Sequence, residues 1–255
     1  MLFTVSQSSP GAAPSQHAPV ETGLHARVLD HLGTAICSGE MAAAAVLSID
    51  DLVDRYQVSR SVIREVLRVL ASMGLLETRR RVGIMIQPAE VWSVFDPQVI
   101  RWRLASEGRM AQMRSITELR TAIEPHAAWL AAERISDDEA SELVGIAAKM
   151  WAAGKVGDEA RFLTLDIEFH RRMLAASGNE MFAKLHVIVA EVLAGRHHYH
   201  LMPHYPDEQA LQLHTDVAQA IQRRDGERAR KAMVGIMEQG FAEIKSMWEQ
   251  TTEPS

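Results

Sequence analysis

The chain has 255 residues, 47% of them hydrophobic and 5% aromatic, so it is long enough for one large domain or two ordinary ones. This apolar content excludes wholesale disorder, and the single cysteine excludes a disulfide framework or a cysteine-based zinc finger. No run of about 18 apolar residues indicates a membrane helix, and the N-terminus lacks the pattern of a signal peptide. We therefore expect a cytoplasmic protein with no membrane partner.

Charge is distributed unevenly along the chain. The net charge is −6, but the segment from Arg55 to Gly83 contains seven arginines and two acidic residues, so it carries +5 and the rest of the chain −11. A basic patch made of arginine alone on an acidic protein is typical of a nucleic-acid-binding surface.

The sequence divides into four parts. Residues 1–22 are rich in Ser, Pro, Ala and Gln and are expected to form a flexible tail. Residues 23–88 and residues 113–250 are expected to form two domains, joined by a linker over 89–112 that contains two tryptophans and one proline. The predicted fold class is mainly α, with a winged helix-turn-helix followed by an all-α bundle.

The N-terminal domain contains the start and stop signals of three short helices and a β-hairpin. Apolar residues every four positions from Leu24 to Ile36 predict the first helix. Ser48 and Ser59 are expected to cap the second and third helices, and Gly74 to end the third. The residues that follow predict two short strands around an arginine-rich turn. This combination predicts a winged helix-turn-helix that binds DNA.

The C-terminal part has helical periodicity throughout. One helix is expected from about Met113, interrupted or kinked at Pro125, and Ser136 begins a second helix as part of a capping box. Loops are expected near Gly154, at 177–179 and at 202–206. No glycine-rich phosphate loop is present, and the pattern predicts a bundle of about six or seven helices.

The third predicted helix carries the candidate DNA-reading residues. Arg60 and Arg64 are four residues apart and share a face, while Val66 and Leu70 lie on another side. Arginine binds guanine O6 and N7 with two hydrogen bonds, or holds a phosphate. A solvated basic face without a partner is the alternative, but such a face would normally include lysine. The candidate DNA-binding residues are Ser59, Arg60, Ser61, Arg64, Arg79, Arg80, Arg81 and Gly83.

The stretch VSRSVIREVLRVLASMGLLETRRRVGIMI resembles the DNA-binding domain of the GntR family of bacterial transcription regulators. The matching positions are Val58-Ser59-Arg60, Ile63-Arg64-Glu65, Leu67, Gly74-Leu75 and Gly83. The resemblance implies a homodimer that binds a palindromic operator in double-stranded DNA. Two positions depart from the family pattern. Residues 41–45 replace the usual Pro-Gly turn, and Asp50 stands where some members have a DNA-contacting arginine.

A possible metal-binding set lies in the C-terminal half. Asp166 and His170 are four residues apart, so they lie one above the other on a helix, and His214 belongs to another helix. A carboxylate oxygen with imidazole nitrogens suits Zn²⁺, Ni²⁺ or Mn²⁺. From spacing alone, a buried hydrogen-bonded pair is the more frequent explanation. A metal-dependent enzyme that uses these three residues is the alternative function, but nothing supplies a placed base or nucleophile.

The segments around IEPHAAWLAAER, Asp166 to His170, and His214 resemble the FadR-type (FCD) ligand-binding domain. The resemblance implies a divalent metal held by one Asp and three His, with an acidic effector above it. Three of these four positions match, and the fourth is Ile236. It also implies that Arg120 faces the effector, although an ion pair with Glu124 is an alternative role.

Arg196 is the second candidate for effector binding, and it begins a cluster with His197, His198 and His200. Consecutive helical residues diverge by about 100°, so at most one or two of these histidines can point inward.

The chain resembles most the D-galactonate and related sugar-acid regulators of the family. This predicts a ligand-responsive regulator rather than an enzyme, with a repressor as the expected form and an aldonate or uronate as the effector.

Overall fold

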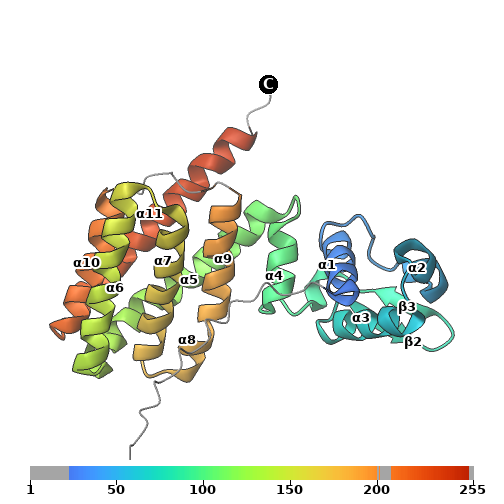
Figure 1. The fold of residues 1–255 in the computed structure, drawn as a ribbon, viewed down its shortest axis with the longest axis horizontal. Helices are drawn as coiled ribbons and strands as arrows, with labels where there is room; N and C mark the ends of the chain where they lie inside the picture. The colour runs from blue at the N-terminus through green and yellow to red at the C-terminus, as the bar shows by residue number, and fades with distance from the viewer. Residues whose placement is uncertain (1–22, 200, 202–207, 253–255) are drawn as a thin grey trace, which may run out of the picture.

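The computed structural model describes residues 23–199, 201 and 208–252. The predicted tail 1–22, His200 and the whole of the predicted loop 202–206 lie outside the described residues. Figure 1 shows the winged helix at one end of the molecule, the helical bundle at the other, and α4 between them. In the described part of the chain, no helix is both long and apolar enough to cross a membrane.

The N-terminal domain is the predicted winged helix, with one additional strand. A two-residue strand pairs with the edge of the hairpin, which makes a three-stranded antiparallel sheet of order β1-β3-β2. The elements are α1 (Leu24–Cys37), β1 (Val46–Leu47), α2 (Ile49–Tyr56), α3 (Arg60–Ser72), β2 (Leu76–Arg79) and β3 (Gly83–Ile86).

Local signals in the sequence fix the helix boundaries of this domain. The Ser48 hydroxyl accepts a hydrogen bond from the Asp51 N–H, and the Ser59 hydroxyl accepts one from the Val62 N–H, so both serines are N-caps as predicted. Gly74 follows α3 with φ +79°, a conformation that glycine adopts without strain. Ala44, within the segment that replaces the Pro-Gly turn, has φ +66°, which is strained for alanine.

The segment 89–112 contains more structure than a linker. It begins with a 3₁₀ turn, η1 (Ala89–Val91), and continues into α4 (Pro97–Leu104). The Asp96 side chain accepts a hydrogen bond from the Gln98 N–H, and Pro97 occupies the first turn, where its missing N–H costs nothing. The same residues that indicated a connector therefore begin a helix.

Two cores meet on α4. Val99 and Trp102 belong to the apolar cluster of the winged helix, and the Trp102 indole N–H donates to Asp30 of α1. Ile100 and Leu104 belong to a different cluster, formed with residues of the C-terminal domain. Neighbouring faces of one short helix are thus buried in different units, so a shift of α4 changes the packing of both.

The C-terminal domain is all-helical, as predicted. Its largest apolar cluster includes Leu143, Met150 and Phe169, all fully buried. The helices are α5 (Arg109–Arg134), α6 (Asp137–Val156), α7 (Glu159–Ala176), α8 (Glu180–Lys184), α9 (His186–His198), α10 (Glu208–Gln222) and α11 (Gly226–Thr252).

Two local expectations for this domain were wrong. Helix α5 begins before Met113 and is not interrupted at Pro125, while a kink there stays a prediction. Its buried residues before the proline, such as Met113, and those after it, such as Ala128, pack into different apolar clusters. Gly154 is not in a loop but inside α6, where a Cβ would lie 2.7 Å from Leu211. The helix ends instead at Gly157, with φ +72°. The capping box at Ser136 is confirmed.

Candidate functional site

The predicted DNA-binding residues form one exposed surface on the winged helix. Ser59, Arg60, Ser61 and Arg64 lie at the start of α3, and all four side chains are exposed. The apolar side of the same helix is fully buried at Ile63 and Val66. The helix therefore packs through one face and presents its arginines to solvent on the other.

The wing carries the remaining arginines. Arg79 is the last residue of β2, and Arg80 and Arg81 form the turn before Gly83. Arg81 has φ +68° and Gly83 has φ +114°, so this turn is tight, and the glycine also lies close to Val46. All three arginines are exposed.

The arginines of this surface differ in their partners. Arg60 is paired with Asp50 of α2, and Arg79 with Glu77 of its own strand. Arg64, Arg80 and Arg81 form no ion pair with any described residue. Three guanidinium groups are thus available for phosphates or bases without first breaking an ion pair.

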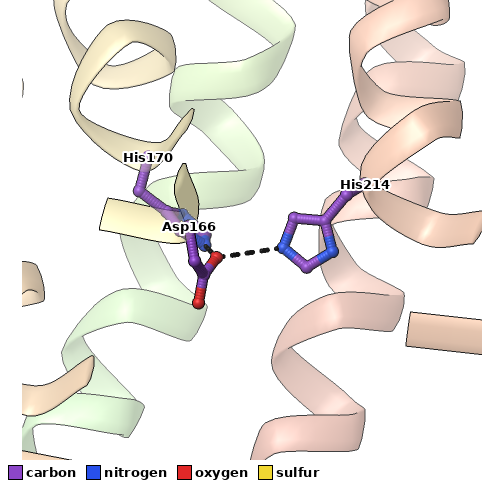
Figure 2. A group of neighbouring side chains, drawn as sticks. All are labelled: Asp166, His170 and His214. Carbon is purple, nitrogen blue, oxygen red and sulfur yellow. Dashed lines mark ion pairs between the residues drawn. The ribbon is translucent and has the colours of Figure 1, made fainter. Parts of the chain in front are cut away.

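A second arrangement of polar residues lies inside the helical domain. Figure 2 shows Asp166 and His170 on α7, with His214 reaching from α10 toward the same carboxylate oxygen. Asp166 Oδ1 lies 3.3 Å from His170 Nε2 and 3.3 Å from His214 Nε2. All three residues are buried, and one ligand atom from each lies within 4.8 Å of the others. The structure therefore brings together the three residues that the sequence indicated.

Two further residues continue this polar cluster onto α5. Glu124, 1% exposed, places Oε2 2.6 Å from His170 Nδ1 and accepts a hydrogen bond of 2.6 Å from Arg120 Nε through Oε1. The guanidinium of Arg120 also lies 3.3 Å from His170 Nε2. The ion pair expected as the alternative role of Arg120 is present, and it connects this arginine with the predicted metal ligands. We call these five residues (Arg120, Glu124, Asp166, His170 and His214) the buried polar cluster.

The proton positions follow from the partners of each ring. A carbonyl oxygen only accepts, so His214 Nδ1, 2.8 Å from the Ala210 carbonyl, carries a proton. His170 Nδ1 and the Glu124 carboxylate oxygen are close enough to require a proton between them. The Nε2 atoms of both rings face the same side of the cluster, each 3.3 Å from Asp166 Oδ1.

Charges within the buried polar cluster shift its pKa values. Burial opposes ionisation of Glu124, but the neighbouring Arg120 and His170 lower the pKa of Glu124 to about 2. Burial also opposes the charged form of His170, yet Glu124 and Asp166 raise the pKa of His170 to about 9. The pKa of Asp166 is lowered by its two histidine partners despite burial. Both carboxylates are therefore ionised at neutral pH.

The other predicted residues lie elsewhere in the domain. Ile236 is partly buried against the apolar core, and its side chain has no atom that could bind a metal. Arg196 is buried in α9, with its guanidinium near Gly240 of α11. His197 is half-buried, 3.8 Å from Glu159, and His198 is exposed.

Sequence reasoning missed the contact between Glu124 and His170. Glu124 was considered only as the partner of Arg120, because the two residues are four apart on one helix. Its contact with His170 joins residues 46 positions apart. A glutamate embedded among apolar residues of an amphipathic helix was the one available signal.

A winged helix with an exposed arginine surface, joined to a helical domain with a buried polar cluster, defines a DNA-binding transcription regulator. The sequence matches the bacterial regulatory proteins of the gntR family over residues 24–86 and the FCD domain over residues 115–239. The chain belongs to the GntR family and carries an FCD domain.

Several known proteins are similar along most of the chain. The galactonate operon transcriptional repressor of Escherichia coli K12 is 25% identical over 223 residues, covering 87% of this chain and 96% of the relative. The Escherichia coli regulator YieP is 23% identical over 224 residues, covering 88% and 96%. The solved structure of Escherichia coli McbR matches with a TM-score of 0.52 and 18% identity, covering 88% of this chain and 98% of that chain, which shows the shared fold.

The matching families and relatives are transcription regulators. They confirm the prediction that the chain is a regulator rather than an enzyme. They do not support the alternative of a metal-dependent enzyme that uses Asp166, His170 and His214.

Proposed function

We propose that the protein is a metabolite-responsive repressor. A small carboxylate, such as an aldonate or uronate, binds in the helical domain and changes the affinity of a homodimer for a palindromic operator. The observation that carries this proposal is the buried polar cluster, because a domain that served only for dimer contacts would have no use for five buried ionisable side chains.

A divalent metal fits three residues of the cluster. Two imidazole nitrogens beside one carboxylate oxygen need a cation or a proton between them, and a metal ion would displace the proton that the raised pKa of His170 retains at neutral pH. Asp166 Oδ1 and His214 Nε2 are buried and make no hydrogen bond of good geometry with a described residue. Two ligands of one tetrahedral ion, each about 2.0–2.1 Å from it, are about 3.4 Å apart, close to the 3.3 Å separations here.

Residues around the ligands support the same site. Metal-binding histidines usually donate their second N–H to a carboxylate or carbonyl. His214 Nδ1 lies 2.8 Å from the Ala210 carbonyl oxygen, and His170 Nδ1 lies 2.6 Å from Glu124 Oε2, so both rings have such a group beside the second nitrogen. Zn²⁺, Ni²⁺ or Mn²⁺ would be held by Asp166, His170 and His214. Because Ile236 offers no ligand atom, a bound ion would keep an open position, where it supplies a Lewis-acidic anchor for the effector carboxylate.

The nature of the effector is supported by residue chemistry and by one relative. Arg120 and Arg196 are buried guanidinium groups of the helical domain, and arginine suits a carboxylate ligand. The 25%-identical relative is named as the repressor of a galactonate operon, and galactonate is an aldonate. A polyhydroxy carboxylate suits a polar, charged cluster better than an acyl chain does.

Helix α4 offers a route from this domain to the DNA-binding surface. Arg101 of α4 forms two hydrogen bonds with Glu191 of α9, at 3.1 and 2.6 Å, while Trp102 of the same helix packs into the winged helix. An effector that favours one position of α9 would favour one position of α4. The coupling requires different effector affinities in the two states, typically about 1–3 kcal/mol.

Metal binding is tested on the purified protein by isothermal titration with Zn²⁺ and by elemental analysis after dialysis. We expect one metal per chain in the wild type and none in Asp166→Ala. His126→Ala, an exposed histidine stacked on Trp129, is the control and should keep the metal. A wild type without metal would contradict this part of the proposal.

Effector control is tested by fluorescence anisotropy on DNA from upstream of the protein's own gene. Each titration is repeated with a panel of aldonates and uronates. We expect one sugar acid to weaken operator binding at least fivefold, within the usual range of allosteric coupling. Operator binding unaffected by every acid would contradict the proposed effector class while leaving the DNA-binding function intact.

A further inference from the structure

One ion pair joins the two helices of the helix-turn-helix. Asp50, in the first turn of α2, pairs through Oδ1 with the guanidinium of Arg60, the first residue of α3. The two side chains are 64% and 62% exposed. An ion pair this exposed contributes little to folding stability. Its significance therefore lies in what it does on the DNA-binding surface.

An acidic residue at this place has an electrostatic disadvantage. Asp50 lies beside the arginine surface of a segment that carries +5, where DNA phosphates are expected to approach. Its charge repels phosphate and cancels part of the attraction of Arg60. High affinity for DNA does not explain an aspartate at this position, whereas selectivity among DNA sequences does.

The shape of the guanidinium explains how both groups can act together. Arginine has five N–H donors in a rigid planar fork. Asp50 occupies a terminal nitrogen, Nη2, of Arg60, and the remaining donors include pairs that can bind guanine O6 and N7 in the major groove. A carboxylate that holds the fork in one orientation favours this base contact over the many geometries available to a phosphate.

We propose that Asp50 is a specificity-determining residue that positions Arg60 to read a guanine in the operator half-site and reduces the binding of Arg60 to the phosphates of other DNA. This inference needs only the DNA-binding function, and it is independent of the metal and the effector.

The next residue supplies a matched control. Asp51 lies in the same first turn of α2 and is exposed, so it has nearly the same relation to the helix dipole. Its carboxylate forms no ion pair with a described residue. Asp51→Asn therefore removes the same charge from the same turn without releasing Arg60.

The test is a selection from duplex DNA with a randomised 20-base-pair core. The full-length wild type, Asp50→Asn, Asp51→Asn, Arg60→Lys and the double variant Asp50→Asn/Arg60→Lys are compared by sequencing the bound DNA. Thermal unfolding confirms that each variant is folded. Anisotropy on one unselected duplex gives the non-specific affinity.

In the wild type, we expect one half-site position with a strong preference for guanine. Asp50→Asn should lower that preference about tenfold, within the range of one bidentate arginine–guanine contact, and raise non-specific affinity. Asp51→Asn should raise non-specific affinity alone. Arg60→Lys should lose the same guanine preference because lysine has no fork, and adding Asp50→Asn should change the preference no further.

Two results would overturn the inference. The first is an unchanged base preference in Asp50→Asn, which would mean that Arg60 needs no positioning. The second is an equal loss of base preference in Asp50→Asn and Asp51→Asn, which would assign the effect to charge alone.

Discussion

The two functional regions of this protein hold their charges in opposite ways. On the winged helix, the arginines of α3 and the wing are exposed, and three of them lack an ion pair with a described residue. In the helical domain, the buried polar cluster is enclosed, and its members contact one another at 2.6–3.3 Å. Exposed charges are free to meet a polyanion, whereas buried charges must be satisfied internally or by a bound ligand.

This difference predicts different costs of substitution. A side chain on the exposed surface contributes to binding and little to folding. A member of the buried polar cluster contributes to both, because removing it leaves its partners buried and unpaired.

The largest effect is expected for Glu124→Ala. This substitution leaves the Arg120 guanidinium and His170 buried without their carboxylate, so the free energy of unfolding should fall by about 3–5 kcal/mol. Urea denaturation measures it. Glu118→Ala, on the same helix and in an exposed pair with Arg114, is the control and should cost less than about 1 kcal/mol. Equal losses in the two variants would remove the distinction between the regions.

Arg64→Ala should show the opposite behaviour. Operator binding should weaken by about 1–3 kcal/mol, because a base or phosphate contact is lost at the start of α3. The free energy of unfolding should stay within about 0.5 kcal/mol of the wild type, since the side chain is exposed. Anisotropy and urea denaturation give the two values. Arg228→Ala, an exposed arginine of α11, is the control, and undiminished operator binding in Arg64→Ala would show that α3 is not the recognition helix.

The stability of the winged helix depends on its packing against α4. A Cβ at Gly33 of α1 would lie 2.5 Å from the Trp102 ring, so Gly33→Ala should lower the free energy of unfolding by about 1–3 kcal/mol. Gly145→Ala is the matched control, because it also lies within a helix but has open space around it. That variant should gain about 0.5–1 kcal/mol from helix propensity. A neutral result at Gly33 would mean that α4 moves away from α1 without cost.

The smallest effect is expected at Ala44. Its φ of +66° is costly for alanine and free for glycine, so Ala44→Gly should stabilise the domain by up to about 1 kcal/mol. A thermal unfolding midpoint that rises by a few degrees, with operator affinity unchanged, is the expected outcome. Destabilisation would show that the turn at 41–45 tolerates this conformation through contacts of the alanine methyl group.

The sequence predicted most of the fold because its signals are local. The serine caps of α2, α3 and α6 and the glycine after α3 lie within a few residues of the boundaries that they set. Strand β1 was missed because two residues give no alternation to detect. Helix α4 was missed because Asp96 and Pro97 are as common in a turn as at a helix start.

The candidate site was predictable as far as spacing and family pattern reach. Asp166 and His170 follow from their separation of four residues, and His214 was the third candidate on another helix, a position that the FCD resemblance also matches. The contact of Glu124 with His170 depends on how α5 packs against α7, and no local sequence pattern predicts that packing. The pairing of Asp50 with Arg60 depends in the same way on the angle between α2 and α3.

We propose that the buried polar cluster controls the affinity of the exposed DNA-binding surface for its operator. The most direct measurement is operator affinity with and without galactonate, for the wild type and for Asp166→Asn, a substitution that keeps the shape of the side chain and removes its charge. We expect galactonate to weaken operator binding at least fivefold in the wild type and to have no effect in Asp166→Asn, while the affinity without galactonate is the same in both. An equal galactonate effect in the two proteins would contradict it.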